Sequence, residues 1–96
     1  MAREIKFDWD QWNVQKNEIK HGVSRIEAES AFFDPRYMLF EDRRYSNTSE
    51  KRYILYGKGV ESRVLMVGFT LRRSMVRIIT ARPASRKERK IYEGKK

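Results

Sequence analysis

The chain has 96 residues, a formal net charge of +9, no cysteine and one histidine. This length fits a single domain, residues 1–96, with one modest core. Without cysteine there is neither a disulfide framework nor a thiolate metal site, and one histidine cannot assemble the usual multi-ligand zinc cluster. We therefore expect no metal and no cofactor.

The surplus positive charge sits in the second half of the chain. Residues 1–48 hold 8 Lys and Arg against 9 Asp and Glu, and residues 49–96 hold 14 against 4, so the halves carry −1 and +10. A basic surface of this kind attracts a polyanion, most simply nucleic acid. There is no apolar run of about 18 residues, and Met1–Glu4 leads into alternating residues rather than a signal peptide. We expect a soluble cytoplasmic protein without a membrane partner.

The first third of the chain predicts a strand and a helix. Ile5, Phe7 and Trp9 alternate with charged residues, which is typical of a short strand with one buried face. Asp10 is a candidate N-cap for a helix. The stretch from Gln11 to Lys20 is helix-forming, and His21 is the expected last residue. Trp12 and Ile19 recur at two-turn spacing as its apolar residues, and Gly22 stands where a left-handed C-cap belongs.

A second helix follows directly. Ser24 and Glu27 have the spacing of a capping box, and Ala28, Ala31 and Phe32 form an apolar stripe. The pair Asp34-Pro35 ends this helix, since the residue before a proline disfavours helical backbone.

The rest of the chain predicts four strands and a terminal helix. The strands, rich in β-branched and aromatic residues, are Tyr37–Glu41, Arg52–Lys58, Leu65–Leu71 and Val76–Arg82. Short connections favour antiparallel neighbours, and the polar stretch Asp42 to Lys51 is expected to be a mobile loop. Ser85 and Glu88 form a capping box for a basic helix from Arg86 to Glu93. The predicted fold is α+β, β-α-α-β-β-β-β-α, with an antiparallel sheet packed against helices.

Arginine is the most informative candidate for chemistry, because its planar fork of donors matches phosphate and stays charged. The candidates are Arg72, Arg73, Arg77, Arg82, Arg86 and Arg89. By strand parity Arg77 and Arg82, five residues apart, lie on opposite faces, so one of them must be paired or line a cleft. The basic run of the last helix is more typical of a solvated helix face.

Two further clusters contain titratable groups. Lys20 and His21 end a helix, where the helix dipole favours a protonated imidazole that binds phosphate or donates a proton, although C-capping alone explains the pair. Glu50 and Arg52 lie two residues apart at the entry to a strand, either as a general base with its partner or as a surface ion pair. Tyr53, Tyr56, Phe69 and Tyr92 either stack on bases or, more commonly for aromatic residues in strands, belong to the core.

Several blocks of the chain, spread from about residue 5 to residue 93, closely resemble the BrnT family of toxins from type II toxin–antitoxin systems. The blocks are Phe7-Asp8-Trp9-Asp10, Asn17, Lys20-His21-Gly22-Val23, Phe32-Phe33-Asp34-Pro35, Glu50 with Arg52, Gly57, Arg77-Ile78-Ile79-Thr80-Ala81-Arg82, and Ala84-Ser85 through Glu88-Arg89 to Tyr92.

The resemblance implies a RelE-like fold, a ribonuclease that arrests translation, and a co-expressed BrnA antitoxin with a ribbon-helix-helix part. The toxin–antitoxin complex of such systems represses its own operon, so operator DNA would be bound only through the antitoxin. Cleavage by attack of the ribose 2′-OH needs a base, cations around the phosphorane and an acid.

The resemblance together with this chemistry suggests roles for individual residues. Arg72, Arg77 and Arg82 would clamp phosphate and stabilise the transition state, Lys20 and His21 would transfer protons or orient phosphate, and Glu50 is a possible base. The RNA-binding candidates are Arg52, Arg73, Arg86 and Arg89. Two other readings remain open: a non-catalytic nucleic-acid-binding module, and a basic dock for an acidic protein.

Overall fold

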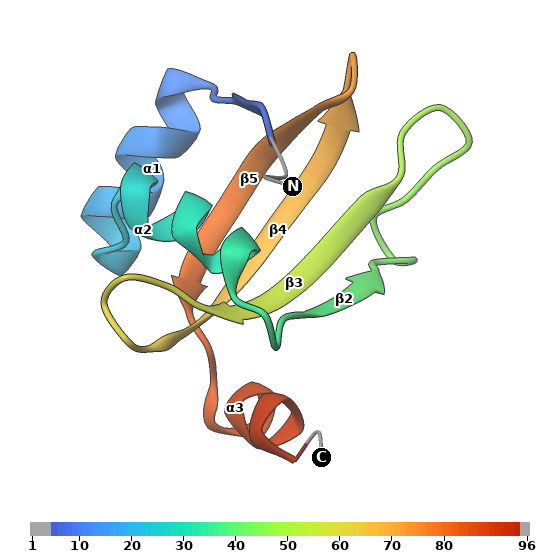
Figure 1. Ribbon diagram of the computed structural model, residues 1–96. Helices are drawn as coiled ribbons and strands as arrows, with labels where there is room; N and C mark the ends of the chain where they lie inside the picture. The colour runs from blue at the N-terminus through green and yellow to red at the C-terminus, as the bar shows by residue number, and fades with distance from the viewer. Residues whose placement is uncertain (1–4, 95–96) are drawn as a thin grey trace.

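The computed structural model describes residues 5–94, so the N-terminal residues used in the signal-peptide argument lie outside the described part. The elements are β1 (Phe7–Asp8), α1 (Gln11–His21), α2 (Arg25–Ser30), the 3₁₀ helix η1 (Ala31–Phe33), β2 (Met38–Glu41), β3 (Arg52–Lys58), β4 (Val64–Arg72), β5 (Met75–Pro83) and α3 (Arg86–Glu93). The predicted α+β order is confirmed. In Figure 1, α1 and α2 lie beside and over the strands, and α3 sits at one end of the sheet.

The five strands form one sheet in the order β1-β5-β4-β3-β2. β2 to β5 pair as antiparallel neighbours, as the short connections predict. β1 differs, because it pairs in parallel with β5, Phe7 opposite Val76 and Asp8 opposite Arg77. No turn joins these two strands, so connection length does not fix their relative direction.

The predicted caps are present with one difference. Asp10 accepts the N–H of Trp12, and Gly22 adopts a left-handed conformation with φ of 66°. Ser24 accepts the N–H of Glu27, but the Glu27 carboxylate binds Arg63 at 2.7 and 2.8 Å. Of the two predicted capping boxes, the one of Ser85 and Glu88 has both halves.

The core fills the face of the sheet that the first helices cover. Leu65, Val67 and Ile78 from the strands pack with Phe32 and Ala31 from the helical segments. Gly57 permits this close approach, since a Cβ there would lie 2.5 Å from the Ala31 carbonyl oxygen. η1 can therefore lie directly on β3.

Trp12 and Ile19 do not form a buried apolar face on α1. Trp12 and Ile19 are 70% and 86% exposed, whereas Asn17 is 2% exposed. Asn17 Oδ1 accepts the N–H of Ala81 at 3.2 Å, and Lys16 Nζ donates to the carbonyl of Ile79 at 3.2 Å. Beyond its short pairing with β1, β5 is an edge strand whose peptide groups need partners. α1 supplies them with polar side chains, which is why its apolar residues face outward.

Candidate active site

A β-bulge in β5 brings the arginines of this strand onto one face. Phe69 pairs with Ile78 and Gly68 pairs with Thr80, so Ile79 is the extra residue. A bulge reverses the alternation of side chains beyond it. The prediction that Arg77 and Arg82 lie on opposite faces is therefore wrong.

The cross-strand pairs confirm this arrangement. Arg77 lies opposite Thr70, and Thr70 lies opposite Arg52. Arg82 lies opposite Met66, four residues from Thr70 and hence on the same face of β4. Directly opposed residues share a face. The arginines thus project from the face opposite the core.

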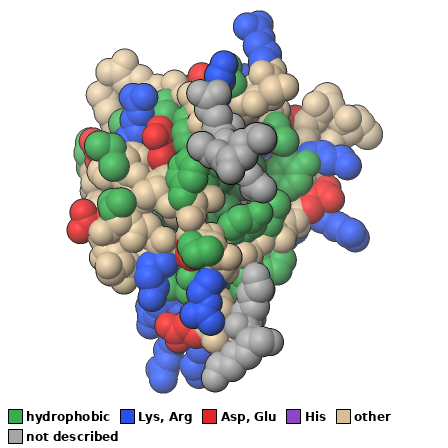
Figure 2. Space-filling view, in the orientation of Figure 1, with side chains coloured by type: hydrophobic (Ala, Val, Ile, Leu, Met, Phe, Trp, Pro, Cys, Tyr) green, Lys and Arg blue, Asp and Glu red, His purple; other side chains and the backbone are tan. Residues whose placement is uncertain are grey.

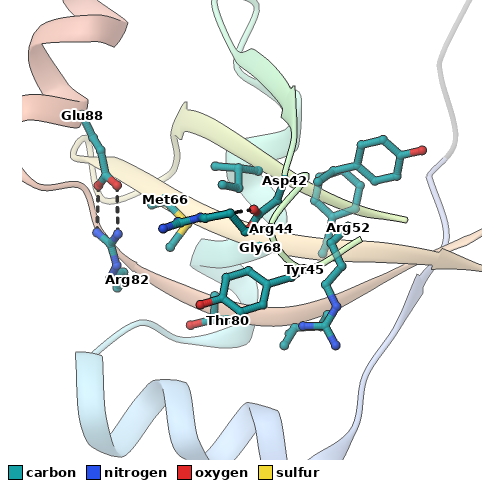
Figure 3. Close-up of a pocket in the computed structure, with 13 residues that line it drawn as sticks. Asp42, Arg44, Tyr45, Arg52, Met66, Gly68, Thr80, Arg82 and Glu88 are labelled. Carbon is teal, nitrogen blue, oxygen red and sulfur yellow. Dashed lines mark hydrogen bonds and ion pairs between the residues drawn. The ribbon is translucent and has the colours of Figure 1, made fainter. Parts of the chain in front are cut away.

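A cavity of about 250 Å³ opens on this arginine-bearing face, over β3, β4 and β5. Figure 3 shows Arg82 and Glu88 joined at one end, Tyr45 beside Thr80, and Arg52 at the other side. The lining residues are Asp42, Arg44, Tyr45, Arg52, Tyr53, Ile54, Met66, Gly68, Phe69, Ile79, Thr80, Arg82 and Glu88. The cavity combines an apolar floor with charged groups at its margins.

Arg82 is held rigidly at the cavity by Glu88. Its Nη1 and Nη2 donate to the two carboxylate oxygens at 2.8 and 2.9 Å, and Nη1 also donates to the Pro83 carbonyl at 3.2 Å. The hydrogen bond to Glu88 raises the pKa of Arg82, and the same bond lowers the pKa of Glu88. These contacts take three of the five guanidinium N–H groups, so Nε and one hydrogen of Nη2 have no partner among the described residues. They are available to a phosphate oxygen.

His21 lies within electrostatic reach of Arg82 and is half-buried. Burial lowers the pKa of His21 below 6.5, and the neighbouring charges of Lys20, Arg82 and Lys16 lower it further. The expectation that the helix terminus keeps this imidazole protonated near neutral pH is wrong, because burial and three cations outweigh the dipole. An imidazole of lowered pKa is suited to accept a proton. Lys20 is exposed.

Glu50 and Arg72 form a second group on the same face. Glu50 binds Arg72 Nη2 at 3.2 Å and lies 3.8 Å from Arg52 Nε. Along β4, Arg72 is six residues from Met66, the neighbour of Arg82, which corresponds to about 20 Å. Glu50 and Arg72 therefore lie at the other end of the face from Arg82.

Arg77 is tied to the N-terminal segment. Its Nη1 donates to Asp8 at 3.0 Å and its Nη2 donates to Asp10 at 3.3 Å. Asp10 also caps α1, so this arginine joins β5, β1 and the start of the first helix. The contacts give Arg77 a clear role in the fold.

The remaining RNA-binding candidates lie outside the cavity. Arg73 is exposed in the tight β4–β5 turn, with φ of 52°. Arg86 is exposed on α3, and Arg89 donates to the Ala84 carbonyl and lines a separate groove with Lys58. Figure 2 shows Lys and Arg side chains gathered around α3, at the lower end of the molecule.

Sequence reasoning missed several residues that line the cavity. Arg44 and Tyr45 lie in a stretch treated only as a polar loop, and Glu88 was assigned only to the helix cap. The sequence contains a signal for Glu88 as a partner of Arg82, since Glu88 is a carboxylate in the first turn of a helix that begins just after Arg82. Tyr45 is an aromatic residue within a polar stretch, which is a second usable signal.

The comparisons with known proteins identify the family. Residues 9–88 match the family model described as the ribonuclease toxin, BrnT, of type II toxin–antitoxin systems. The chain belongs to the BrnT family. The crystal structure of the Brucella abortus ribonuclease toxin BrnT matches with a TM-score of 0.62 and 22% sequence identity, over 86% of this chain and all of that one. No curated protein sequence matches the chain.

Membership confirms the resemblance that the sequence motifs indicated. The BrnT family consists of ribonuclease toxins, and a type II system pairs each toxin with an antitoxin partner. The structural match confirms the fold. Within residues 5–94, no helix is long and apolar enough to cross a membrane. The same residues contain no group of three His, Cys, Asp or Glu arranged to hold a metal ion.

Proposed function

We propose that this BrnT-family protein is an endoribonuclease that cleaves RNA at the arginine-bearing face without a metal ion or cofactor. The ribose 2′-oxygen attacks the adjacent phosphorus and the P–O5′ bond breaks. The products are a 2′,3′-cyclic phosphate and a 5′-hydroxyl end. A base takes the 2′-hydroxyl proton, an acid protonates the leaving oxygen, and cations stabilise the phosphorane.

One observation carries the proposal: Glu88 fixes Arg82 at the cavity with N–H groups to spare. His21 does not line the cavity, but the charge of Arg82 contributes to the lowering of its pKa. In this scheme Arg82 stabilises the phosphorane and His21 accepts the 2′-hydroxyl proton. Lys20 orients the phosphate or protonates the leaving oxygen. Glu50 is the weaker candidate base, because it is engaged by two arginines at the far end of the face.

The other arginines form an extended RNA-binding surface. Each arginine of the face has a carboxylate partner among the described residues, which are Asp42 for Arg44, Glu50 for Arg52 and Arg72, Asp8 and Asp10 for Arg77, and Glu88 for Arg82. The face therefore offers oriented donors rather than surplus charge. Arg72 and Arg77 contact phosphate along the strands, and Arg52, Arg73, Arg86 and Arg89 hold the flanking RNA.

The antitoxin partner is proposed to be a BrnA-like protein with a ribbon-helix-helix part. Such a partner, acidic or amphipathic, would cover the arginine-bearing face and the basic helix α3 in a hetero-oligomer, and so exclude RNA. The complex would bind operator DNA through the antitoxin and repress its operon. Free toxin would act on RNA in the cytoplasm and arrest translation.

End-group analysis in the presence of EDTA tests the reaction. Purified protein is incubated with a labelled single-stranded RNA, and the proposal predicts new 5′-hydroxyl and 2′,3′-cyclic phosphate ends that form without added metal. Binding without new ends would favour the non-catalytic module instead. Cleavage that disappears in EDTA and returns with magnesium would overturn the metal-free mechanism.

A salt titration separates RNA binding from the third reading, a dock for an acidic protein. Each phosphate contact releases counterions, so the affinity for RNA should fall steeply as salt concentration rises. An absence of RNA binding at low salt would favour the protein dock.

A further inference from the structure

The loop from Asp42 to Lys51 contains several hydrogen bonds of its own. Ser46 Oγ donates to the Asp42 carbonyl and accepts the N–H of Arg52, both at 2.8 Å. Asn47 Oδ1 accepts the N–H groups of Ser49 and Glu50 at 2.9 and 2.7 Å. These contacts give the stretch a defined turn conformation, and its expected mobility stays a prediction. In this conformation the loop brings the side chain of Tyr45 to the cavity.

Tyr45 stands on this loop at the margin of the cavity. It is 60% exposed, although it lines the cavity, and Figure 3 shows its ring beside Thr80. The Arg44 guanidinium lies 5.6 Å from the ring centroid, so a cation and an aromatic ring are offered together. The ring makes no aromatic contact with another ring among the described residues. With 60% of the residue exposed, the ring offers surface to a planar ligand.

The cavity floor suits a flat, apolar group. Ile54, Met66 and Ile79 line it, and Gly68 contributes no side chain at its centre. By alternation Ile79 shares the face of Arg77, and the bulge at Ile79 places Thr80 on the cavity side as well. A volume of about 250 Å³ is slightly below the usual range of about 300–1,000 Å³ for small-molecule sites, which favours a single base over a larger ligand.

We propose that Tyr45 is a stacking platform for an unpaired RNA base next to the scissile phosphate. The base enters between the Tyr45 ring and the apolar floor, while the phosphate reaches Arg82 at the end of the same cavity. Every base has a π face, and stacking on an aromatic side chain holds unpaired RNA without requiring a particular base. This inference rests on the proposed function, since it places the substrate of that site.

Binding of an uncleavable RNA tests the platform separately from catalysis. The probe is a 2′-O-methylated hexanucleotide of A and U with a central 2-aminopurine, whose fluorescence falls when the base stacks. The variants are Tyr45→Ala and Tyr45→Phe. Phe33→Ala is the matched control, because Phe33 is 55% exposed and lies on η1, which packs on the covered face of the sheet.

Tyr45→Ala is expected to weaken binding about 5- to 150-fold and to abolish the quench. Tyr45→Phe and Phe33→Ala should bind like the wild type, with unchanged circular dichroism in all variants. Wild-type quench in Tyr45→Ala would overturn the platform, and so would equal losses in Tyr45→Ala and Tyr45→Phe, which would assign the effect to the hydroxyl. Failure of the wild type to cleave unmodified RNA would refute the proposed function instead, because the probe reports binding alone.

Discussion

Glu88→Gln is the substitution that separates the two roles of Glu88. Glutamine still accepts the N–H of Ser85 and so preserves the capping box of α3. It removes the charge that holds Arg82 through two hydrogen bonds. We therefore expect the variant to fold with its helix intact and to lose the fixed orientation of the arginine.

The size of the effect follows from the exposure of the pair. Hydrogen bonds to charged groups contribute about 1.5–3 kcal/mol to stability. The side chains of Arg82 and Glu88 are 33% and 17% exposed, so solvent screening reduces this contribution to about 1–2 kcal/mol. For a domain of this size the melting temperature should fall by about 4–16 °C. Cleavage should slow about 10- to 100-fold, because misplaced catalytic groups are this costly.

The pH dependence of Glu88→Gln gives an independent check. Hydrogen bonding to Arg82 keeps the pKa of Glu88 below its ordinary value in the folded protein, against the opposing effect of burial. A lowered pKa stabilises the fold fully above the unfolded-state value, about 4.3, and this contribution is lost as pH falls through the folded-state value. The gap in melting temperature between wild type and variant should therefore narrow as pH falls below about 4.3.

Thermal melts and single-turnover cleavage measure these effects, with Glu93→Gln as the control. Glu93 is an exposed carboxylate at the end of the same helix. Glu88→Gln that melts and cleaves like the wild type would refute the argument that the ion pair positions Arg82.

Three further outcomes are expected. Burial and the hydrogen bond to Asp34 raise the pKa of Tyr92 to about 12. The stability that this phenol contributes is therefore full below its unfolded-state pKa of about 10 and is lost as pH rises from about 10 to about 12. The Tyr92→Phe variant should lack this alkaline loss of stability, and parallel denaturation curves for variant and wild type would contradict the argument. The acid limb of the pH–rate profile should lie below pH 6.5, where the lowered pKa of His21 places it, and a higher midpoint would exclude this base. The Asn17→Ala variant should lose about 1–3 kcal/mol in urea unfolding because the N–H of Ala81 loses its acceptor, and an unchanged midpoint would show that this bond contributes nothing.

Local patterns predicted the elements well. Arg52–Lys58 and Arg86–Glu93 match β3 and α3 residue for residue, and Gly22 ends α1 as expected. These features depend on near neighbours in the chain, such as β-branched runs, a capping box and a residue that tolerates positive φ. Sequence reasoning is strong where the cause is local.

The site depends on contacts that the sequence pattern does not reveal. Nothing in the run from Arg77 to Arg82 marks Ile79 as an extra residue, so strand parity gave the wrong face. The apolar spacing of Trp12 and Ile19 predicted a buried helix face, but the edge of β5 required polar partners from α1. Both errors arose from the pairing of β5. Its bulge sets which face its arginines occupy, and its open edge sets which side chains of α1 face the sheet.

The most direct test of the central claim is the cleavage rate of Arg82→Ala at saturating RNA under single-turnover conditions. Arg36→Ala is the control, since Arg36 is an exposed arginine that does not line the cavity. The account predicts that Arg82→Ala stays folded and cleaves about 10²- to 10³-fold more slowly, the usual cost of removing one transition-state donor, while Arg36→Ala cleaves at the wild-type rate. A folded Arg82→Ala variant that cleaves as fast as the wild type would contradict the assignment of the active site.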